Sequence, residues 1–164
     1  MGILCQSFRD KSPAFLYQIF GSDISQEMIA LCQKGQYSGR TLEHFKTTKP
    51  ELFQKYMKAS GDGVFQAAPE VRSRLRFHTH NLFKPLVSRD RFDLVLCRNV
   101  LIYFSPADQE SVLEKLMPRM SENSTLIVGE SESLTHIRSD FKYLEPLIYS
   151  ANGKSPAVLN QAVA

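Results

Sequence analysis

The chain has 164 residues, of which 43% are hydrophobic and 23% are charged. This length and apolar content suit one domain with a sizeable core, and they exclude collagen-like and wholly disordered chains. The formal net charge of +3 is too small to indicate nucleic-acid binding, and no apolar stretch approaches the roughly 18 residues of a membrane span. The first residues lack the pattern of a secretory signal, so we expect a cytoplasmic protein without membrane insertion.

Short apolar runs alternate with helical patterns, which is typical of a layered α/β fold. Residues 15–20 are predicted to form a buried strand that ends at Gly21-Ser22-Asp23. A helix should follow, with Ser25 as its N-terminal cap and Gly35 at its end. Residues 37–57 are predicted to hold a further helix with one apolar face.

The middle of the chain is predicted to be rich in strands. After a turn at residues 60–63, a short strand is expected at 64–67 and another at 75–80. The strongest strand signal is the apolar run at residues 92–97, which predicts burial on both faces in a parallel sheet. Arg98-Asn99 ends this run abruptly.

The last part of the chain begins with a clear helix start. Ser105-Pro106-Ala107-Asp108 places a serine cap before a proline and a carboxylate in the first turn. Residues 125–128 are predicted to form another buried strand, and residues 141–149 a final hairpin. Residues 151–164 are expected to be a loose tail.

Polar side chains stand where three of the predicted strands end. Asp23 follows the first strand, Asn81 a later one, and Arg98 with Asn99 the strongest. In open α/β sheets, ligands bind outside the carboxyl ends of the strands. A carboxylate can accept both hydroxyls of a ribose, and an amide followed by the backbone N–H of Leu82 can read the edge of adenine. Taken singly, however, Asp and Asn at such positions are more often turn formers or helix caps.

The segment FDLVLCRNVLIYF, residues 92–104, closely resembles the signature of the chemotaxis receptor methyltransferases, the CheR family. Other pieces are similar to the family's segments and follow in the same order. They are residues 22–25, 35–38, 76–82 and 129–134. The similarity runs from about residue 19 to 150, which is nearly the whole chain.

The resemblance implies a class I, Rossmann-like methyltransferase fold with S-adenosylmethionine (SAM) as its cofactor. It implies methyl transfer to glutamate side chains on the cytoplasmic helices of chemoreceptors, which would be the partners of this chain. Matched by position, Asp23 would hold the ribose, and Asn81 with Leu82 would hold the adenine.

The resemblance also implies residues on the reacting side of the cofactor. Arg98 and Asn99 would contact the methionine part of SAM, and Tyr103 would lie near the methyl group, which makes Tyr103 and Arg98 the implied catalytic residues. Without the resemblance, core packing is an equal interpretation of Tyr103, and a surface ion pair is the alternative for Arg98. Glu130 and Glu132 look like a paired acid, and Glu130 stands where the family usually has histidine.

No metal site is predicted. His78 and His80 share a strand face without an evident third ligand, and the three cysteines lack zinc spacing. The alternating Arg72, Arg74 and Arg76 would share one strand face, where a solvated surface is a commoner interpretation than a docking surface.

Residues 1–18 match neither the family's first strand nor its glycine-containing cofactor loop. We therefore expect a partial methyltransferase domain at residues 1–150, truncated at its N-terminal side, with a short insertion near 58–68. The family's first strand lies between strands two and four, so two inner strand edges should be unpaired. Weak or no SAM binding by this chain alone is expected. The alternative function is a degenerate, non-catalytic module that binds a receptor or another signalling partner.

Overall fold

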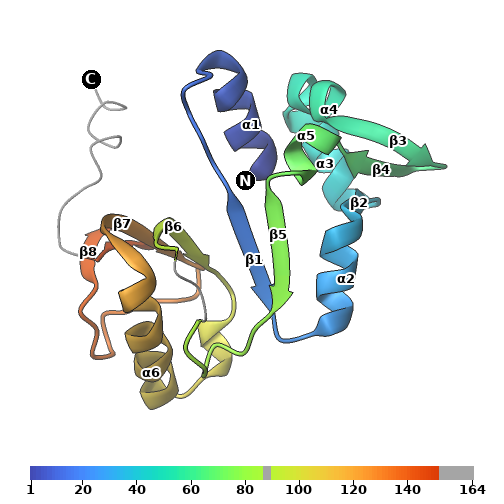
Figure 1. Ribbon diagram of the computed structural model, residues 1–164. Coiled ribbons are helices and arrows are strands. Elements are labelled where there is room, and N and C mark those ends of the chain that lie inside the picture. Colours follow the sequence, from blue (N-terminus) through green and yellow to red (C-terminus); the bar gives the residue numbers. More distant parts are fainter. Residues whose placement is uncertain (87–89, 152–164) are drawn as a thin grey trace. The chain divides into compact units, whose positions relative to one another are not determined.

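The computed structural model describes residues 1–86 and 90–151, so the expected tail lies outside the described residues except for Ala151. The chain divides into two compact units, Met1–Asn81 and Leu82–Ala164, which are described separately below. Figure 1 shows helices and strands in both units, as expected for an α/β protein. No helix in the described part of the chain is long and apolar enough to span a membrane.

The first unit combines a parallel strand pair with a small antiparallel sheet. Its elements are α1 (Gly2–Lys11), β1 (Ile19–Asp23), α2 (Gln26–Lys34), β2 (Gln36–Tyr37), α3 (Arg40–Thr48), α4 (Pro50–Tyr56), β3 (Met57–Gly61), β4 (Val64–Ala67), α5 (Pro69–Arg72) and β5 (Leu75–Thr79). β1 runs parallel to β5, with Asp23 opposite Thr79 at their carboxyl ends. β4 lies between β2 and β3, and both pairings are antiparallel. The hairpin of β3 and β4 occupies the expected insertion region.

Two predictions in this unit need correction. The strand predicted at residues 15–20 begins only at Ile19, because Phe15 belongs to a turn in which its N–H donates to the Ser12 carbonyl. The single helix predicted at 37–57 is two helices, α3 and α4. Pro50 lacks an N–H and disfavours helical geometry at the residue before it, so Lys49 breaks the helix with a φ of −138°.

The second unit is built around a four-stranded sheet. Its elements are β6 (Phe92–Cys97), the 3₁₀ turn η1 (Leu101–Tyr103), α6 (Pro106–Leu116), the 3₁₀ turn η2 (Met117–Arg119), β7 (Met120–Val128), β8 (Lys142–Glu145) and β9 (Ile148–Ser150). The strand order is β6-β7-β9-β8, with β6 parallel to β7 and the other pairs antiparallel. The predicted final hairpin is confirmed as β8 and β9. The predicted serine cap is also confirmed, since Ser105 Oγ accepts from the Asp108 N–H at 3.3 Å.

The core of the second unit lies between α6, η1 and the sheet. Its most deeply buried members are Leu101, Val112, Leu113, Leu126 and Val128. Because Leu101 belongs to the loop that follows β6, the core anchors this loop directly.

β6 is more exposed than the sequence predicts. Leu94 and Leu96 have 42% and 46% of their surface accessible, so the expected burial on both faces is wrong. Side chains alternate along a strand, so Leu94 and Leu96 lie on the same face of β6, and this face is not buried. Within the described part of the chain, β6 pairs only with β7, and β1 likewise pairs only with β5.

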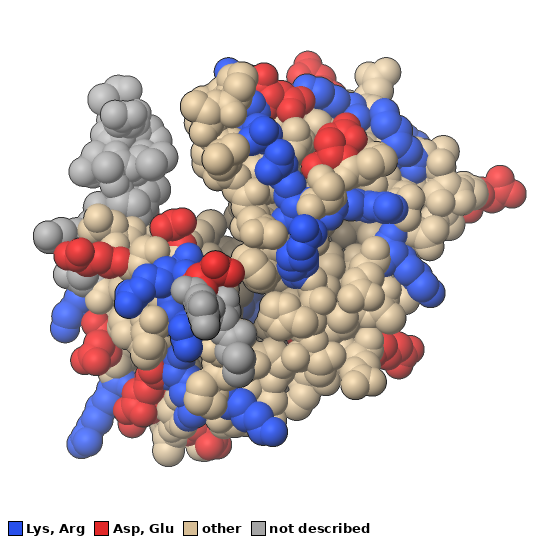
Figure 2. Space-filling model, in the orientation of Figure 1, with Lys and Arg blue, Asp and Glu red and all other residues tan. Residues whose placement is uncertain are grey.

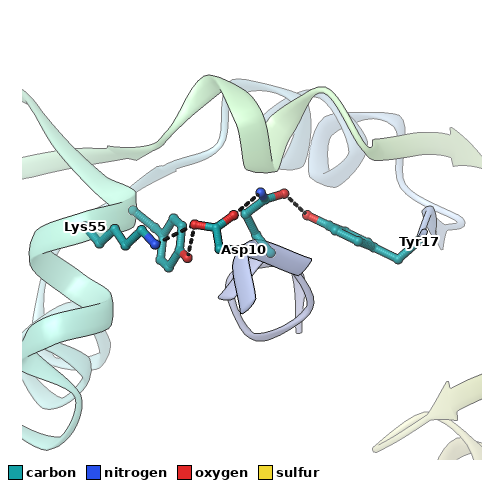
Figure 3. Close-up of polar contacts among 5 residues, drawn as sticks. Asp10, Tyr17 and Lys55 are labelled. Carbon is teal, nitrogen blue, oxygen red and sulfur yellow. Dashed lines mark hydrogen bonds and ion pairs between the residues drawn. The ribbon is translucent and has the colours of Figure 1, made fainter. Parts of the chain in front are cut away.

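A polar network joins α1 to α4 in the first unit (Figure 3). The Asp10 carboxylate accepts hydrogen bonds from Gln6 and Tyr56 at 2.7 and 2.9 Å, and it forms an ion pair with Lys55. Gln6 in turn accepts from the Tyr17 hydroxyl at 2.9 Å. Hydrogen bonds from Lys55, Gln6 and Tyr56 lower the pKa of Asp10 to about 2. The charged form of Asp10 is therefore the one that the folded state stabilises.

An Asp10→Asn variant should have a lower melting temperature than the parent at pH 7, and the difference should shrink under acid. The folded pKa of Asp10 is depressed, so its stabilising contribution is present above pH 4 and is lost as the pH falls towards 2. Thermal unfolding followed by circular dichroism between pH 2 and 7 measures this difference. Glu43→Gln is the control, because Glu43 forms only an exposed ion pair with Lys46 at 3.8 Å. A pH-independent difference for Asp10→Asn would contradict the assignment.

Candidate functional site

The carboxyl ends of β1 and β5 bring two predicted site residues to one end of the first unit. The His80 N–H donates to the Asp23 carbonyl at 2.9 Å, which extends the strand pairing to the residue before Asn81. Asp23 is exposed and Asn81 is half-buried. The two side chains that were predicted to hold the adenosine therefore follow neighbouring parallel strands.

Asp23 also helps to begin α2. One carboxylate oxygen, Oδ1, accepts the Ser25 N–H at 2.8 Å, and Ser25 Oγ accepts the Met28 N–H at 3.3 Å. Asp23 is thus a turn former, as the alternative interpretation held. Its second oxygen, Oδ2, has no hydrogen-bond partner among the described residues. An exposed carboxylate with one oxygen fixed and one open has the chemistry that a ribose hydroxyl requires.

The loop after β6 carries the other predicted side chains. Arg98 and Asn99 are exposed, and Asn99 adopts the left-handed backbone conformation with a φ of 58°. Tyr103 is 78% exposed, so its alternative interpretation as a core residue is wrong. Leu101, two residues earlier, enters the core instead, because the 3₁₀ turn, with about three residues per turn, directs the side chains of Leu101 and Tyr103 to different sides.

Arg98 forms an ion pair with an acidic residue of the second unit. Its guanidinium lies 3.9 Å from the Glu130 carboxylate, and both side chains are largely exposed. The surface ion pair suggested by the sequence is therefore present. Exposed pairs of this kind contribute little to stability, so Arg98 remains available to an incoming anion.

A buried carboxylate, whose contact with this loop the sequence did not predict, lies beneath it. Glu132 is 6% exposed, and its Oε1 accepts the N–H groups of Val100 and Leu101 at 2.8 and 2.7 Å, with a longer contact of 3.3 Å from Ile102. Its Oε2 accepts the N–H groups of Asn99 and Gly129 at 2.9 and 2.5 Å. One carboxylate thus accepts hydrogen bonds from the backbone N–H groups at the start of η1 and from the Gly129 N–H. The N–H groups at the start of a short helical turn have no partners within the turn.

The charge of Glu132 follows from two opposing effects. Burial raises the pKa of the carboxyl, but the hydrogen bonds from four backbone N–H groups lower it further than burial raises it. The net pKa is lowered, so Glu132 is ionised at neutral pH. Glu130 and Glu132 do not form an acid pair, because the Glu130 side chain is 86% exposed on the surface whereas Glu132 is buried.

Gly129 allows this arrangement. A Cβ atom at this position would lie 2.4 Å from Asn99 Oδ1 and 2.7 Å from Glu132 Oε2, as well as 2.9 Å from the Asn99 nitrogen. Any side chain would separate these groups, so only glycine fits between Asn99 and Glu132. The sequence carries no local signal for this contact, because Glu132 and Asn99 are 33 residues apart.

The predicted residues divide between the two units. Asp23 and Asn81 belong to the first, whereas Arg98, Asn99 and Tyr103 belong to the second. Leu82, the remaining predicted residue, packs partly buried against the core of the second unit. The described residues contain no group of three or more His, Cys, Asp or Glu side chains that could hold a metal ion.

Basic side chains gather elsewhere on the first unit. Figure 2 shows Lys and Arg side chains in a run over the region of α1 and α5, whereas acidic and basic side chains are mixed over the second unit. Arg72 ends α5, Arg74 lies over the Tyr17 ring at 5.3 Å, and Arg76 belongs to β5, so the three do not share one strand face. A cavity of about 220 Å³ is lined by Arg72 and Arg76, among others, and by none of the predicted site residues.

Comparison with known proteins identifies relatives of the chain. Residues 1–149 match the sequence model of the CheR methyltransferase SAM-binding domain. Chemotaxis protein methyltransferase 1 of Pseudomonas aeruginosa is 33% identical over 128 residues, which cover 78% of this chain and 46% of that protein. Chemotaxis protein methyltransferase Cher2 of Pseudomonas putida is 30% identical over 145 residues, with coverages of 88% and 49%. The chain spans about half the length of the curated relatives it matches.

Solved structures resemble the chain more distantly. The structure of PKMT2 from Rickettsia typhi matches with a TM-score of 0.44 and 19% identity, covering 77% of this chain and 18% of that one. A likeness at this level carries no argument about function.

Proposed function

The chain belongs to the CheR methyltransferase family, and from this premise we propose that it transfers a methyl group from SAM to glutamate side chains on the cytoplasmic helices of chemoreceptors. The observation that carries the proposal is the match of the SAM-binding domain model over residues 1–149, which includes the segment 92–104. Relatives named chemotaxis protein methyltransferases support the same chemistry.

The described residues are chemically suited to the adenosine part of SAM. Asp23 offers an exposed carboxylate oxygen, Oδ2, that is free of partners among the described residues, for the ribose hydroxyls. Asn81 offers an amide beside the backbone N–H of Leu82 for the edge of adenine. We propose these three residues as the adenosine site.

The reaction requires little acid–base chemistry from the protein. A glutamate carboxylate has a pKa near ~4.3 and is already ionised at neutral pH, so no general base is needed. When bound, SAM supplies a methyl group on a sulfonium with a good leaving group. The protein must then align the carboxylate oxygen with the methyl group and remove water from the carboxylate.

We propose that the loop after β6 performs this alignment. The exposed Arg98 guanidinium attracts an incoming glutamate carboxylate or the carboxylate of the cofactor. The exposed ring of Tyr103 presents a π face that stabilises a cationic sulfonium. Asn99 contacts the methionine part of the cofactor. Because the core holds Leu101 within the same loop, these three side chains project from an anchored backbone.

Methyl transfer is tested with the purified chain, labelled SAM and a chemoreceptor cytoplasmic fragment. We expect base-labile incorporation that disappears when the receptor's methyl-accepting glutamates are replaced by alanine. β1 and β6 each have one unpaired edge among the described residues, and we therefore also expect the Kd for SAM to be higher than micromolar. For this reason the assay uses millimolar SAM. Receptor binding without any methyl transfer would contradict the proposal and favour a non-catalytic module.

A further inference from the structure

The proposed chemistry leaves one buried ionised group without a role. Glu132 lies in the turn after β7, and its own N–H donates to the Gly129 carbonyl at 3.0 Å. It is 6% exposed, and it has no ion-pair partner among the described residues. Its charge is balanced by backbone dipoles alone, which come almost entirely from the loop that carries Arg98 to Tyr103.

Four backbone donors from that loop fix its path. Asn99, Val100 and Leu101 donate to Glu132 at 2.9, 2.8 and 2.7 Å, and Ile102 does so at 3.3 Å. A backbone nitrogen can satisfy this geometry only when its peptide plane faces the carboxylate. Successive peptide planes are therefore set by one side chain from the turn after β7.

The most direct consequence concerns Asn99. Its φ of 58° is uncommon for a residue other than glycine, and such a conformation persists when the surrounding structure determines it. Glu132 holds its N–H, and Gly129 leaves room for its Oδ1. The direction of the Asn99 side chain thus depends on the carboxylate of Glu132.

We propose that Glu132 is a positioning residue for the SAM site, which orients Asn99 and Tyr103 through the loop backbone without touching the cofactor or the methyl acceptor. This role rests on the proposed function, because Asn99 and Tyr103 are the side chains proposed to face the methionine part of SAM. A purely structural role, in which Glu132 only stabilises the fold, is the alternative that the experiment must separate.

The test compares Glu132→Gln with Glu130→Gln. The first substitution preserves the shape of Glu132 but removes its charge and replaces one acceptor oxygen by a donor, so some of the loop amides lose their partner. The second removes an equivalent charge two residues away, where the side chain is exposed. Both are made in the full chain and studied well below their melting temperatures.

Two measurements give the outcome. We expect amide hydrogen exchange at Asn99 to Leu101 to accelerate at least tenfold in Glu132→Gln and to stay unchanged in Glu130→Gln. We expect the Kd for SAM, from NMR titration, and the KM for SAM in methyl transfer to rise at least tenfold in Glu132→Gln. A purely structural role reduces the amount of active protein, which lowers kcat and leaves both constants for SAM unchanged.

Unchanged amide exchange, or a Kd and KM for SAM within twofold of the parent, would overturn the positioning role while leaving the proposed function intact. Absence of SAM binding and methyl transfer in the parent itself would overturn the proposed function, and the positioning role with it. If Glu132→Gln does not fold, Gly129→Ala provides a second test. Its Cβ would separate Asn99 from Glu132 without removing the charge, and the same rise in Kd is expected.

Discussion

An Asp23→Asn variant should bind SAM about ten- to a hundredfold more weakly than the parent. Asparagine retains the oxygen that accepts the Ser25 N–H and is an equally good residue at a helix start, so α2 should begin unchanged. The variant loses the negative charge and the second acceptor, Oδ2, which we propose for the ribose. A hydrogen bond to a charged group contributes about 1.5–3 kcal/mol, which corresponds to this range of affinity.

NMR titration of the labelled protein with millimolar SAM measures the loss even when the parent binds weakly. Asp62→Asn serves as the matched control, because Asp62 is an exposed carboxylate in the turn between β3 and β4. An affinity equal to that of the parent for Asp23→Asn would remove Asp23 from the proposed adenosine site. Asp23 would then be only a residue that begins α2.

A Leu101→Ala variant should lose about 2–5 kcal/mol of unfolding free energy. Leu101 is 1% exposed and lies in the core of the second unit, so its truncation leaves a cavity beneath the proposed catalytic loop. The adjacent Ile102 is 47% exposed, and Ile102→Ala should change the free energy by no more than about 0.5 kcal/mol.

Urea denaturation of the two variants gives the comparison directly. Leu101→Ala should also weaken SAM binding, because the loop that carries Asn99 and Tyr103 loses its anchor. Equal destabilisation by the two substitutions would mean that the loop is not fixed by the core in solution.

Much of the secondary structure could be predicted because its signals are local. Ser25, Gly35 and Ser105 mark helix ends by their own side-chain or backbone chemistry, and the structure confirms all three. The break between α3 and α4 was missed although Pro50 signalled it, because the apolar pattern on both sides continued. β3 was missed as well, since its residues have little apolar alternation and are held mainly by pairing with β4.

The exposure of side chains was predicted less well, because exposure depends on neighbours. The run at residues 92–97 has the apolar character of a strand covered on both faces, yet Leu94 and Leu96 are exposed on an edge strand. Tyr103 and Leu101 are both large and apolar, and only the 3₁₀ turn decides that Leu101 enters the core. A linear pattern records the apolar character of residues and not whether another element covers the face on which they lie.

The sequence by itself determined the family, the α/β class and the polar residues at the strand ends, because these are carried by residue types at fixed spacing. Only the tertiary structure showed that Glu132 accepts hydrogen bonds from the loop that begins at Asn99, and that Gly129 makes room for the contact. These groups come from the ends of two neighbouring parallel strands, β6 and β7. Parallel strands are joined by long connections, so residues that meet at their carboxyl ends are distant in sequence and leave no common local pattern.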